Sequence, residues 1–511
     1  MYSKLSSAQQ NQIKIGQFIS QLRQQKGLSQ SELASSLGTS QSAVARMEKG
    51  EQNFSTEMLS KISEALNKQI ISLGSTAMSF KIEGGKKLSG QIQVRTSKNS
   101  AVGLLCASLL NRGTTILKKM PKIEEVYRII EVMESMDVKV KWLPGNDLEI
   151  VPPKKLKIEQ MDMKTAIKTR SVLMFLGPLI HLAPKFKIPY PGGCQIGRRI
   201  VEPHLYALEN LGVSIETTHG FYHVRKTDLC CNNIVMYESS DTATENALMA
   251  ASKLPGKTVI KYASANYQVQ DLCFFLQQLG VKIAGIGTTT LEIIGNPDIN
   301  QQVEYYPSED PIEAMLFLSI AATTGSEIII KGCPIDFLEL ELFKLEKMGF
   351  KYKIIKDYLA QNGQTKLVDI KTFSSKLTAL KDKIYGRPYP GLNIDNLPLF
   401  VPIATQAYGE TFIHDWVYEN RAIYYTDLNK LGAEIRLVDP HRVYIKGPTK
   451  LRAAEVVCPP ALRPAAIIMI AMLAAKGTSI LRNVYSINRG YEDLSARLQT
   501  LGARIEIIRG L

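Results

Sequence analysis

The sequence has no hydrophobic run long enough to cross a membrane, no CxxC cysteine pair and no low-complexity tract. Its longest apolar stretches, such as residues 465–475, reach half the length of a membrane-spanning helix. The first residues lack the basic-then-apolar pattern of a secretory signal. The seven cysteines form an odd, scattered set, which argues against a disulfide framework or a zinc site. These absences predict a protein of the reducing cytoplasm that does not use a membrane.

Acidic residues are scarce relative to basic ones. The chain has 62 lysines and arginines against 48 aspartates and glutamates, a net charge of +14. Residues 1–78 hold eight basic and five acidic residues, so that +11 belongs to the rest of the chain. Such an excess is typical of proteins that bind nucleic acid or an anionic small substrate, and it also occurs as a merely solvated basic surface. At 511 residues the chain also exceeds one ordinary hydrophobic core, and two or more domains are expected.

Residues 10–70 predict four or five short helices. Ser29 and Glu32 form an S-x-x-E capping box that opens one helix, and Gly38 stops it. Residues 40–48 form the next helix, which ends at Gly50. The spacing of the apolar residues places one face of each helix inward. This segment therefore predicts a small all-α domain.

From residue 80 onward a pattern recurs six times, with a period of roughly 70 residues, longer than the usual solenoid periods. A helix ends in a Leu-Gly-like turn and runs into an alternating strand, with the central turn residues Asp137, Gly212, Gly280, Gly349, Gly432 and Gly502. A second unit places a glycine between an apolar helix and a strand, where we expect a left-handed cap, at Gly113, Gly256, Gly325, Gly409 and Gly477. Six such α/β units predict two lobes of three units each, with a ligand cleft between them.

Three motifs carry a resemblance to a known family. They are Thr96-Ser97-Lys98-Asn99, the loop at residues 191–199 (PGGCQIGRR) and Asn488-Arg489-Gly490-Tyr491-Glu492. Together they resemble the UDP-N-acetylglucosamine branch of the enolpyruvyl transferase family. The resemblance implies an α/β (α+β) fold, a two-lobed inside-out α/β barrel of six βαβαββ units over residues 79–511. Lobe one would take about residues 98–301, and lobe two about residues 79–97 plus 302–511.

The resemblance also implies roles for single residues. Cys194, in the glycine-flanked mobile loop, is the general acid, Asp310 the base, and Lys98 the third catalytic residue. Substrate binding falls to Asn99, Arg170, Arg199, Glu202, His204, Ser240, Arg463 and Arg489. Arginine and lysine suit the phosphates and the carboxylate involved.

Each of these residues also has a simpler structural explanation. A cysteine is most often a small buried residue, although Gly-Gly before Cys194 and Gly-Arg-Arg after it argue against that here. Asp310 could simply cap the helix that follows, and Glu309 is a competing base. A lone arginine is usually a surface group.

The sequence departs from the family at several positions. Ala461 stands where a second active-site aspartate is expected, and Asp241-Thr242 stands where Val-Gly is usual. Residues 266–268 replace acidic residues, and residues 389–393 differ from the family loop. A shikimate-3-phosphate enolpyruvyl transferase would share the fold, but that branch lacks the cysteine loop.

Residues 15–66 resemble a Cro/C1-type helix-turn-helix domain, which with its linker would take residues 1–78. The resemblance implies that Gln41, Ser42 and Arg46 enter the major groove of double-stranded DNA, and that Gln30 contacts a phosphate. The alternative is a protein-docking module that binds no DNA, in keeping with its modest charge. Such domains usually bind as dimers, so a homodimer is expected.

The resulting hypothesis is an enzyme that transfers the enolpyruvyl group of phosphoenolpyruvate to the 3-hydroxyl of UDP-N-acetylglucosamine and releases phosphate, in peptidoglycan synthesis. No metal or organic cofactor is implied. The alternative is a DNA-binding regulator whose transferase domain, altered at Ala461, senses a sugar nucleotide.

Overall fold

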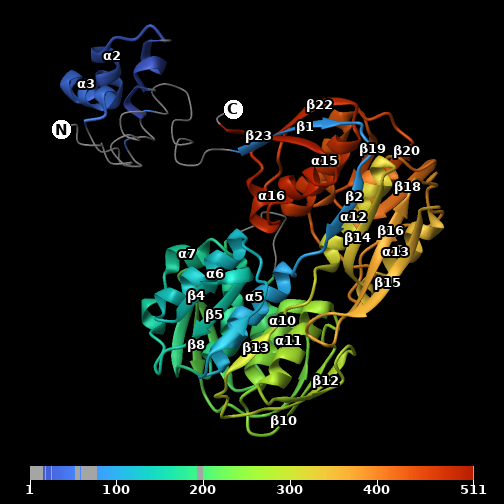
Figure 1. Ribbon diagram of the computed structural model, residues 1–511. Coiled ribbons are helices and arrows are strands. Elements are labelled where there is room, and N and C mark those ends of the chain that lie inside the picture. The colour runs from blue at the N-terminus through green and yellow to red at the C-terminus, as the bar shows by residue number, and fades with distance from the viewer. Residues whose placement is uncertain are drawn as a thin grey trace. The chain divides into compact units, whose positions relative to one another are not determined.

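The computed structural model describes residues 15–17, 19–24, 26–51, 58, 62, 78–192 and 200–509 (Figure 1). The chain divides into two compact units, residues 1–78 with 508–511 and residues 79–507. Within the described ranges no helix has the length and apolar character needed to cross a bilayer.

The N-terminal unit is helical, as the capping residues predict. Residues 15–17 and 19–24 are helical, followed by α2 (Gln30–Leu37) and α3 (Gln41–Lys49). Ser29 and Glu32 form the predicted capping box, and Gly38 ends α2 in the left-handed conformation. The buried core is apolar and consists of Ile19, Leu22, Leu33, Ala34, Leu37, Ala43, Val44, Met47 and Ile62.

The second unit contains six small sheets in its described residues, three in each half of the unit. The first half holds the sheets β13-β3-β5-β4, β6-β8-β7 and β11-β12-β10-β9. Their bounds are β3 (Thr115–Leu117), β4 (Lys139–Leu143), β5 (Asp147–Val151), β6 (Lys185–Pro189), β7 (Val213–Thr218), β8 (Phe221–Lys226), β9 (Asn233–Val235), β10 (Lys257–Lys261), β11 (Lys282–Ala284), β12 (Thr290–Ile294) and β13 (Val303–Tyr305).

The second half holds the sheets β15-β16-β14-β2, β17-β18-β20-β19 and β21-β22-β1-β23. Their bounds are β1 (Met78–Gly84), β2 (Ser89–Gln93), β14 (Glu327–Pro334), β15 (Lys351–Leu359), β16 (Lys366–Phe373), β17 (Ile384–Tyr385), β18 (Gly409–His414), β19 (Glu434–Asp439), β20 (Arg442–Gly447), β21 (Glu455–Val457), β22 (Gly477–Arg482) and β23 (Arg504–Arg509). Five of the six sheets, all but β6-β8-β7, combine a parallel pair with antiparallel pairs.

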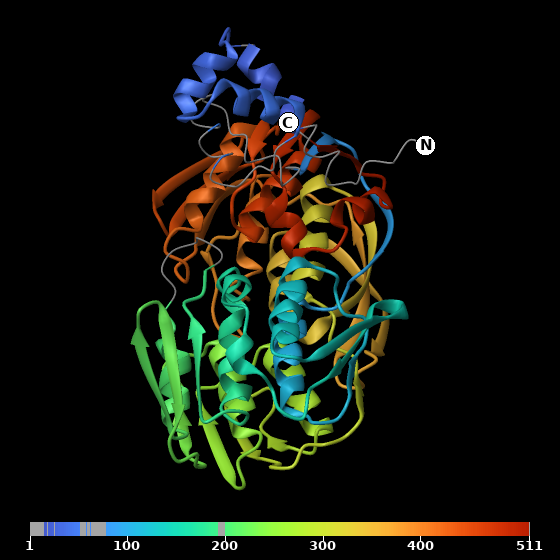
Figure 2. The same ribbon diagram turned by 90° about the vertical axis from the view of Figure 1, so that its left-hand side faces the viewer.

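Helices fill the interior of each half, with the sheets outside them (Figure 2). The first half contains α5 (Lys98–Ala107), α6 (Glu124–Ser135), α7 (Met163–Ile167), α8 (Leu176–Leu179), α9 (Glu202–Glu209), α10 (Asp241–Ala251) and α11 (Tyr267–Gln278). The second contains α12 (Pro311–Thr324), α13 (Glu339–Lys347), α14 (Phe400–Ala404), α15 (Leu462–Ala474), α16 (Tyr485–Gly490) and α17 (Leu494–Gln499). Nearly every residue of α12 and α15 is buried, because both helices are apolar on all sides.

Two chain segments join the halves, residues 94–97 and 306–310. Strand β2 lies in the second half and α5 in the first, whereas β13 lies in the first half and α12 in the second. Thr96 and Glu309 pair across the two segments in an isolated antiparallel bridge. The starts of α5 and α12 therefore lie close to each other, where the halves meet.

The six recurring turns share one backbone conformation. The central residue is left-handed in all six, with φ between 74° and 91°. Five are glycine, and Asp137 takes the same conformation with φ 74°. The second set of glycines was predicted wrongly in part, because Gly113 and Gly256 are not left-handed. At Gly113 a Cβ atom would lie 2.3 Å from the Gln301 carbonyl oxygen, so close backbone approach explains this glycine.

We expect Gly212→Ala to destabilise the protein more than Gly502→Ala. Both positions are left-handed, which costs an alanine about 1 kcal/mol. At residue 502 nothing lies within 4 Å of the added Cβ, whereas at 212 the Asp228 carbonyl oxygen would lie only 2.0 Å away. Gly212→Ala should therefore cost about 2–4 kcal/mol in total. Equal shifts of the thermal unfolding midpoint in the two variants would contradict this account.

Candidate active site

A cleft lies where the two halves meet. It is lined by Lys98 from the start of α5, Asp310 and Glu313 from the start of α12, and Tyr491 just after α16. Ser97 caps α5 by accepting from the Ser100 amide. The helix beginning at residue 98 thus places the first predicted cation at the rim of the cleft.

Glu125 interacts electrostatically with two of the predicted cations, Lys98 and Arg489. Its carboxylate pairs with Arg489 at 3.0 Å and accepts hydrogen bonds from Thr169 (2.5 Å) and Ser171 (2.6 Å). Burial alone would raise the pKa of Glu125, but the charges of Lys98 and Arg489 and the two hydroxyl donors lower it to about 2. Glu125 is therefore ionised, pairs with Arg489 from the second half of the unit, and feels the charge of Lys98 from the first half.

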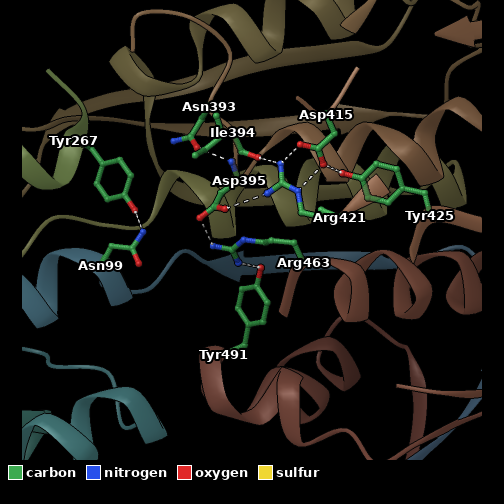
Figure 3. A network of polar contacts seen from close by, with 10 residues as sticks. All are labelled: Asn99, Tyr267, Asn393, Ile394, Asp395, Asp415, Arg421, Tyr425, Arg463 and Tyr491. Carbon is green, nitrogen blue, oxygen red and sulfur yellow. Dashed lines mark hydrogen bonds and ion pairs between the residues drawn. The ribbon is translucent and has the colours of Figure 1, made fainter. Parts of the chain in front are cut away.

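Arg463 lies at the centre of a second network (Figure 3). Its side chain is buried, and it donates to the Tyr491 hydroxyl at 2.7 Å and to the Asp395 carboxylate at 3.4 Å. Figure 3 also shows Asn99, whose amide donates to the Tyr267 hydroxyl at 3.0 Å. A planar guanidinium fixed by two oxygen acceptors is a suitable partner for a phosphate or carboxylate.

A second buried arginine, Arg421, helps to position Asp395. This fully buried guanidinium pairs with Asp415 at 2.6 Å, lies 3.6 Å from Asp395 and donates to the Ile394 carbonyl oxygen at 2.7 Å. The buried pair therefore fixes the backbone that presents Asp395. The Asp395 side chain is 26% exposed, so a bound molecule could still reach it.

Asp310 both caps a helix and faces the cleft. Its carboxylate accepts from the Ile312 amide at 2.8 Å, as the capping interpretation predicts. Burial, partly offset by Arg463, raises the pKa of Asp310 to about 6. Glu309, the competing residue, has its pKa raised by burial to about 7. Asp310 is thus both structurally engaged and poised to exchange a proton near neutral pH.

Ala461 occupies the N-cap position of α15 without any side-chain capping bond. It is fully buried, two residues before Arg463. By contrast, Ser97 caps α5 and Asp310 caps α12. Ala461 therefore supplies neither a helix cap nor a carboxylate at this position, two residues before Arg463.

A third group of predicted residues lies in the first half, on α9 and at the start of α10. His204 is buried, and it accepts from the Asn246 amide at 2.8 Å and lies 3.3 Å from the Thr242 hydroxyl. Burial and the charge of Arg170 lower the pKa of His204 to about 3, so the ring is neutral. Ser240 is half-buried at the N-cap of α10, and Glu202 is exposed at the start of α9.

The predicted loop residues lie mostly outside the described residues. Cys194 and Arg199 belong to residues 193–199, which the structure does not describe. Arg170 lies at the start of the short helix at residues 170–175 and donates to the Ile200 carbonyl oxygen at 2.9 Å. The first described residue after the loop, Ile200, thus lies beside one of the predicted arginines.

The substituted positions near α10 form their own hydrogen bonds. Asp241 accepts from the Ser264 hydroxyl at 2.5 Å and from the Asn266 amide at 3.0 Å. Glu245 is buried and accepts from Gln268 at 3.2 Å. Burial raises the pKa of both carboxyl groups. The amides at 266 and 268 are therefore matched to carboxyl groups on α10.

The helix α3 of the N-terminal unit presents the residues predicted to read DNA. Gln41, Ser42 and Arg46 are exposed, whereas Val44 and Met47 are buried. Gln30 donates to the Glu48 carboxylate at 3.0 Å. Glu48 also forms a buried ion pair with Arg23, at 2.5 Å, which joins the first helix to α3.

Sequence reasoning missed four residues of the site, namely Glu125, Tyr267, Asp395 and Arg421. Glu125 follows Glu124 at the start of an amphipathic helix, where acidic residues are common for electrostatic reasons alone. Tyr267 lies within the stretch 266–268 and Asp395 two residues beyond the stretch 389–393, so the departures of these two stretches from the family pattern were the signals in the sequence. In the described residues no group of His, Cys, Asp and Glu could hold a metal ion.

Comparisons with known proteins show which families the chain matches. The family described as EPSP synthase (3-phosphoshikimate 1-carboxyvinyltransferase) matches residues 82–498, and a helix-turn-helix family matches residues 19–73. A UDP-N-acetylglucosamine 1-carboxyvinyltransferase of Treponema denticola is 34% identical over 427 residues, 83% of this chain and 98% of the relative. The enzyme of that name from Bradyrhizobium diazoefficiens is 33% identical over 425 residues, 83% and 97% of the two chains.

Two solved structures share the fold. The enolpyruvyl transferase NikO from Streptomyces tendae has a TM-score of 0.73 at 21% identity, covering 85% of this chain and all of the other. EPSP synthase from Acinetobacter baumannii has a TM-score of 0.66 at 18% identity, covering 84% of this chain and all of the other.

Proposed function

The chain belongs to the EPSP synthase family of enolpyruvyl transferases, with UDP-N-acetylglucosamine 1-carboxyvinyltransferases among its relatives, and from that membership we propose its substrates. The resemblance and the fold class predicted from the sequence are confirmed. We propose that the enzyme transfers the enolpyruvyl group of phosphoenolpyruvate to the 3-hydroxyl of UDP-N-acetylglucosamine and releases phosphate, in peptidoglycan synthesis.

One observation carries the proposal: three predicted cations meet around the cleft. Lys98 lines the cleft, Arg489 pairs with Glu125, and Arg463 is fixed by Tyr491 and Asp395. Phosphoenolpyruvate carries a phosphate and a carboxylate on three carbons, and such a donor needs several cations at short range. Charge that develops on the phosphate as the C–O bond breaks would be stabilised by the same groups without rearrangement.

The acid and base of the reaction fall to Cys194 and Asp310. Transfer requires an addition, in which C3 of the enolpyruvyl group takes a proton and the attacking hydroxyl loses one as it bonds to C2, and then an elimination, in which C3 gives up a proton as the C2–O bond to phosphate breaks. We propose Cys194 as donor and Asp310 as acceptor, because the pKa of Asp310, about 6, lies near the working pH. Asp395 is the rival base, since it is more exposed and lies on the same network.

We expect kcat to rise with pH through about 6 and then level off. A raised pKa keeps Asp310 protonated below that value, and only the carboxylate can accept a proton. Asp310→Asn should abolish this rise of kcat with pH and lower kcat about 10²–10⁴-fold. Asp395→Asn is the matched variant. If kcat still rises with pH in Asp310→Asn but not in Asp395→Asn, the base is Asp395 instead.

Ala461→Asp should raise turnover. The new carboxylate would cap α15, where the N-cap position has no side-chain bond, and would lie two residues from Arg463. A capping bond contributes about 0.5–2 kcal/mol, which opposes the cost of placing a carboxylate at this fully buried position. Unchanged or lower turnover, with an unfolding midpoint at least as high as the wild type, would mean that the site is built around alanine.

An assay of phosphate release tests the enzyme against its alternative. Release should require both phosphoenolpyruvate and UDP-N-acetylglucosamine, with either substrate alone as the control. The loss at Ala461 favours a second candidate, a sugar-nucleotide sensor that regulates DNA binding. Tight binding of UDP-N-acetylglucosamine in calorimetry, with no phosphate released, would establish that sensor and refute the enzyme.

We propose that the N-terminal unit binds double-stranded DNA as a dimer. The supporting observation is the exposed set Gln41, Ser42 and Arg46 on a helix capped at both ends. Selection from a random duplex pool, followed by gel shift, should yield a bound sequence with two half-sites. Failure to retain any duplex even at low salt would make the unit a protein-docking module.

A further inference from the structure

The sheet β15-β16-β14-β2 presents lysines on its outward face. Residues 347–383 contain nine lysines and three aspartates, a net +6 of the +11 that lies beyond residue 78. On β16, Ile370 and Thr372 are buried and mark the inward face, whereas Lys371 between them is exposed. We call this surface the lysine face. Its members are Lys351, Lys353 and Lys356 on β15, Lys371 on β16 and the half-buried Lys331 on β14.

At the centre of the lysine face two lysines occupy directly opposite positions on neighbouring strands. Lys353 on β15 lies directly opposite Lys371 on β16. Like charges at such positions destabilise a sheet. In the part of the chain that the structure describes, neither lysine has an ion-pair partner. The nearest carboxylate on this face, Asp369, already accepts from the Tyr358 hydroxyl at 2.8 Å and the Gly332 amide at 3.0 Å.

Other sheets of the same unit neutralise comparable lysines. Lys257 on β10 pairs with Glu292 at 2.8 Å, and Lys446 on β20 lies 3.6 Å from Glu434. Outward-facing lysines in this fold therefore do not all lack an ion-pair partner, as Lys353 and Lys371 do among the described residues.

Protection of the sheet edge explains only part of the pattern. Lysines on an edge strand discourage pairing with other chains, and β15 is an edge strand. Lys371 and Lys331 lie on the inner strands β16 and β14, where that protection is not needed. Aromatic rings lie among the lysines, with Lys371 over Phe373 at 5.4 Å and Lys356 over Tyr358 at 4.9 Å. The cluster as a whole suits an extended anion.

We propose that the lysine face binds the phosphate backbone of duplex DNA, so that the transferase unit adds sequence-independent affinity to the helix-turn-helix unit. Phosphate contacts supply most of the affinity of a DNA-binding protein, yet residues 1–78 carry only +3. A covalent link raises the effective concentration of the second surface near any duplex that the first has bound. The choice of DNA among polyanions rests on the proposed function of the N-terminal unit.

The test compares two double variants of the full chain. Lys353→Gln/Lys371→Gln removes two charges from the lysine face, and Lys257→Gln/Lys446→Gln removes two ion-paired charges from other sheets. Binding of a random-sequence duplex is measured by fluorescence anisotropy between 0.05 and about 0.2 M salt. The first variant should lose about tenfold affinity near 0.1 M, and its slope of log K against log salt should fall by about 1.8. The control should keep the wild-type slope.

A slope in the first variant equal to that of the control overturns the proposal. Vesicles of phosphatidylglycerol and phosphatidylcholine form a second arm, and loss of vesicle binding with duplex binding intact would assign the face to a membrane surface instead. Gln41→Ala/Arg46→Ala separates the two DNA proposals. If that variant binds duplex as the wild type does while the lysine variant does not, the helix-turn-helix proposal fails and the lysine face stands.

Discussion

Arg463→Lys is expected to lower kcat/KM for phosphoenolpyruvate by about 10²–10³-fold. The substitution keeps the positive charge but removes the planar fork that contacts Tyr491 and Asp395 together. An ammonium group on a flexible stem cannot satisfy both acceptors and also face a substrate anion. The loss should appear in both kcat and KM, because the same guanidinium binds the donor and stabilises the departing phosphate.

The control for Arg463→Lys is Arg452→Lys, an exposed arginine just after β20. This control should keep kcat/KM within a factor of about two, since exposed single charges contribute little. The unfolding midpoints of both variants are compared with the wild type, because residue 463 is buried. Near-normal kcat/KM in a folded Arg463→Lys would remove this residue from the proposed anion site.

Local features of the fold could be predicted from the sequence because neighbouring residues determine them. The capping box of Ser29 and Glu32 and the left-handed turn at Gly432 depend on residues within one or two helical turns. Even Asp137, which breaks the glycine pattern, is identified by its place in the repeat. The prediction at Gly113 was wrong because the constraint there is the Gln301 carbonyl group, which local sequence does not reveal.

The candidate site could be predicted only as a set of separate residues. Arg489 meets Glu125 across 364 positions of sequence, and Arg463 meets Asp395 across 68. Short motifs surround the cations and identify them, whereas their carboxylate partners lie in ordinary contexts. Asp395 and Glu125 decide how the cations are held, yet acidic residues are common near helix starts and in loops whether or not a binding site is present. Only tertiary contacts connect these carboxylates to the cations.

Cys194→Ala is expected to abolish phosphate release, with a loss of about 10³-fold or more in kcat. The reason lies in the sequence, since residue 194 is outside the described residues: two glycines precede the thiol, and Gly197, Arg198 and Arg199 follow it. Glycines widen the backbone conformations open to a chain segment, and an enclosed thiol can donate a proton to C3. Binding of UDP-N-acetylglucosamine alone should change little, because the thiol acts on the donor.

Cys230→Ala is the matched control for Cys194→Ala, since Cys230 is an exposed cysteine in the same half of the unit. It should keep full activity. A thiol-directed epoxide should inactivate the wild type and Cys230→Ala alike, with phosphoenolpyruvate or the sugar nucleotide altering the rate. If Cys194→Ala instead retains turnover, the proton at C3 must come from another group, and Asp241, whose pKa is raised by burial, would be the first residue to substitute next. The outcome thus decides whether the loop or another part of the site supplies the acid.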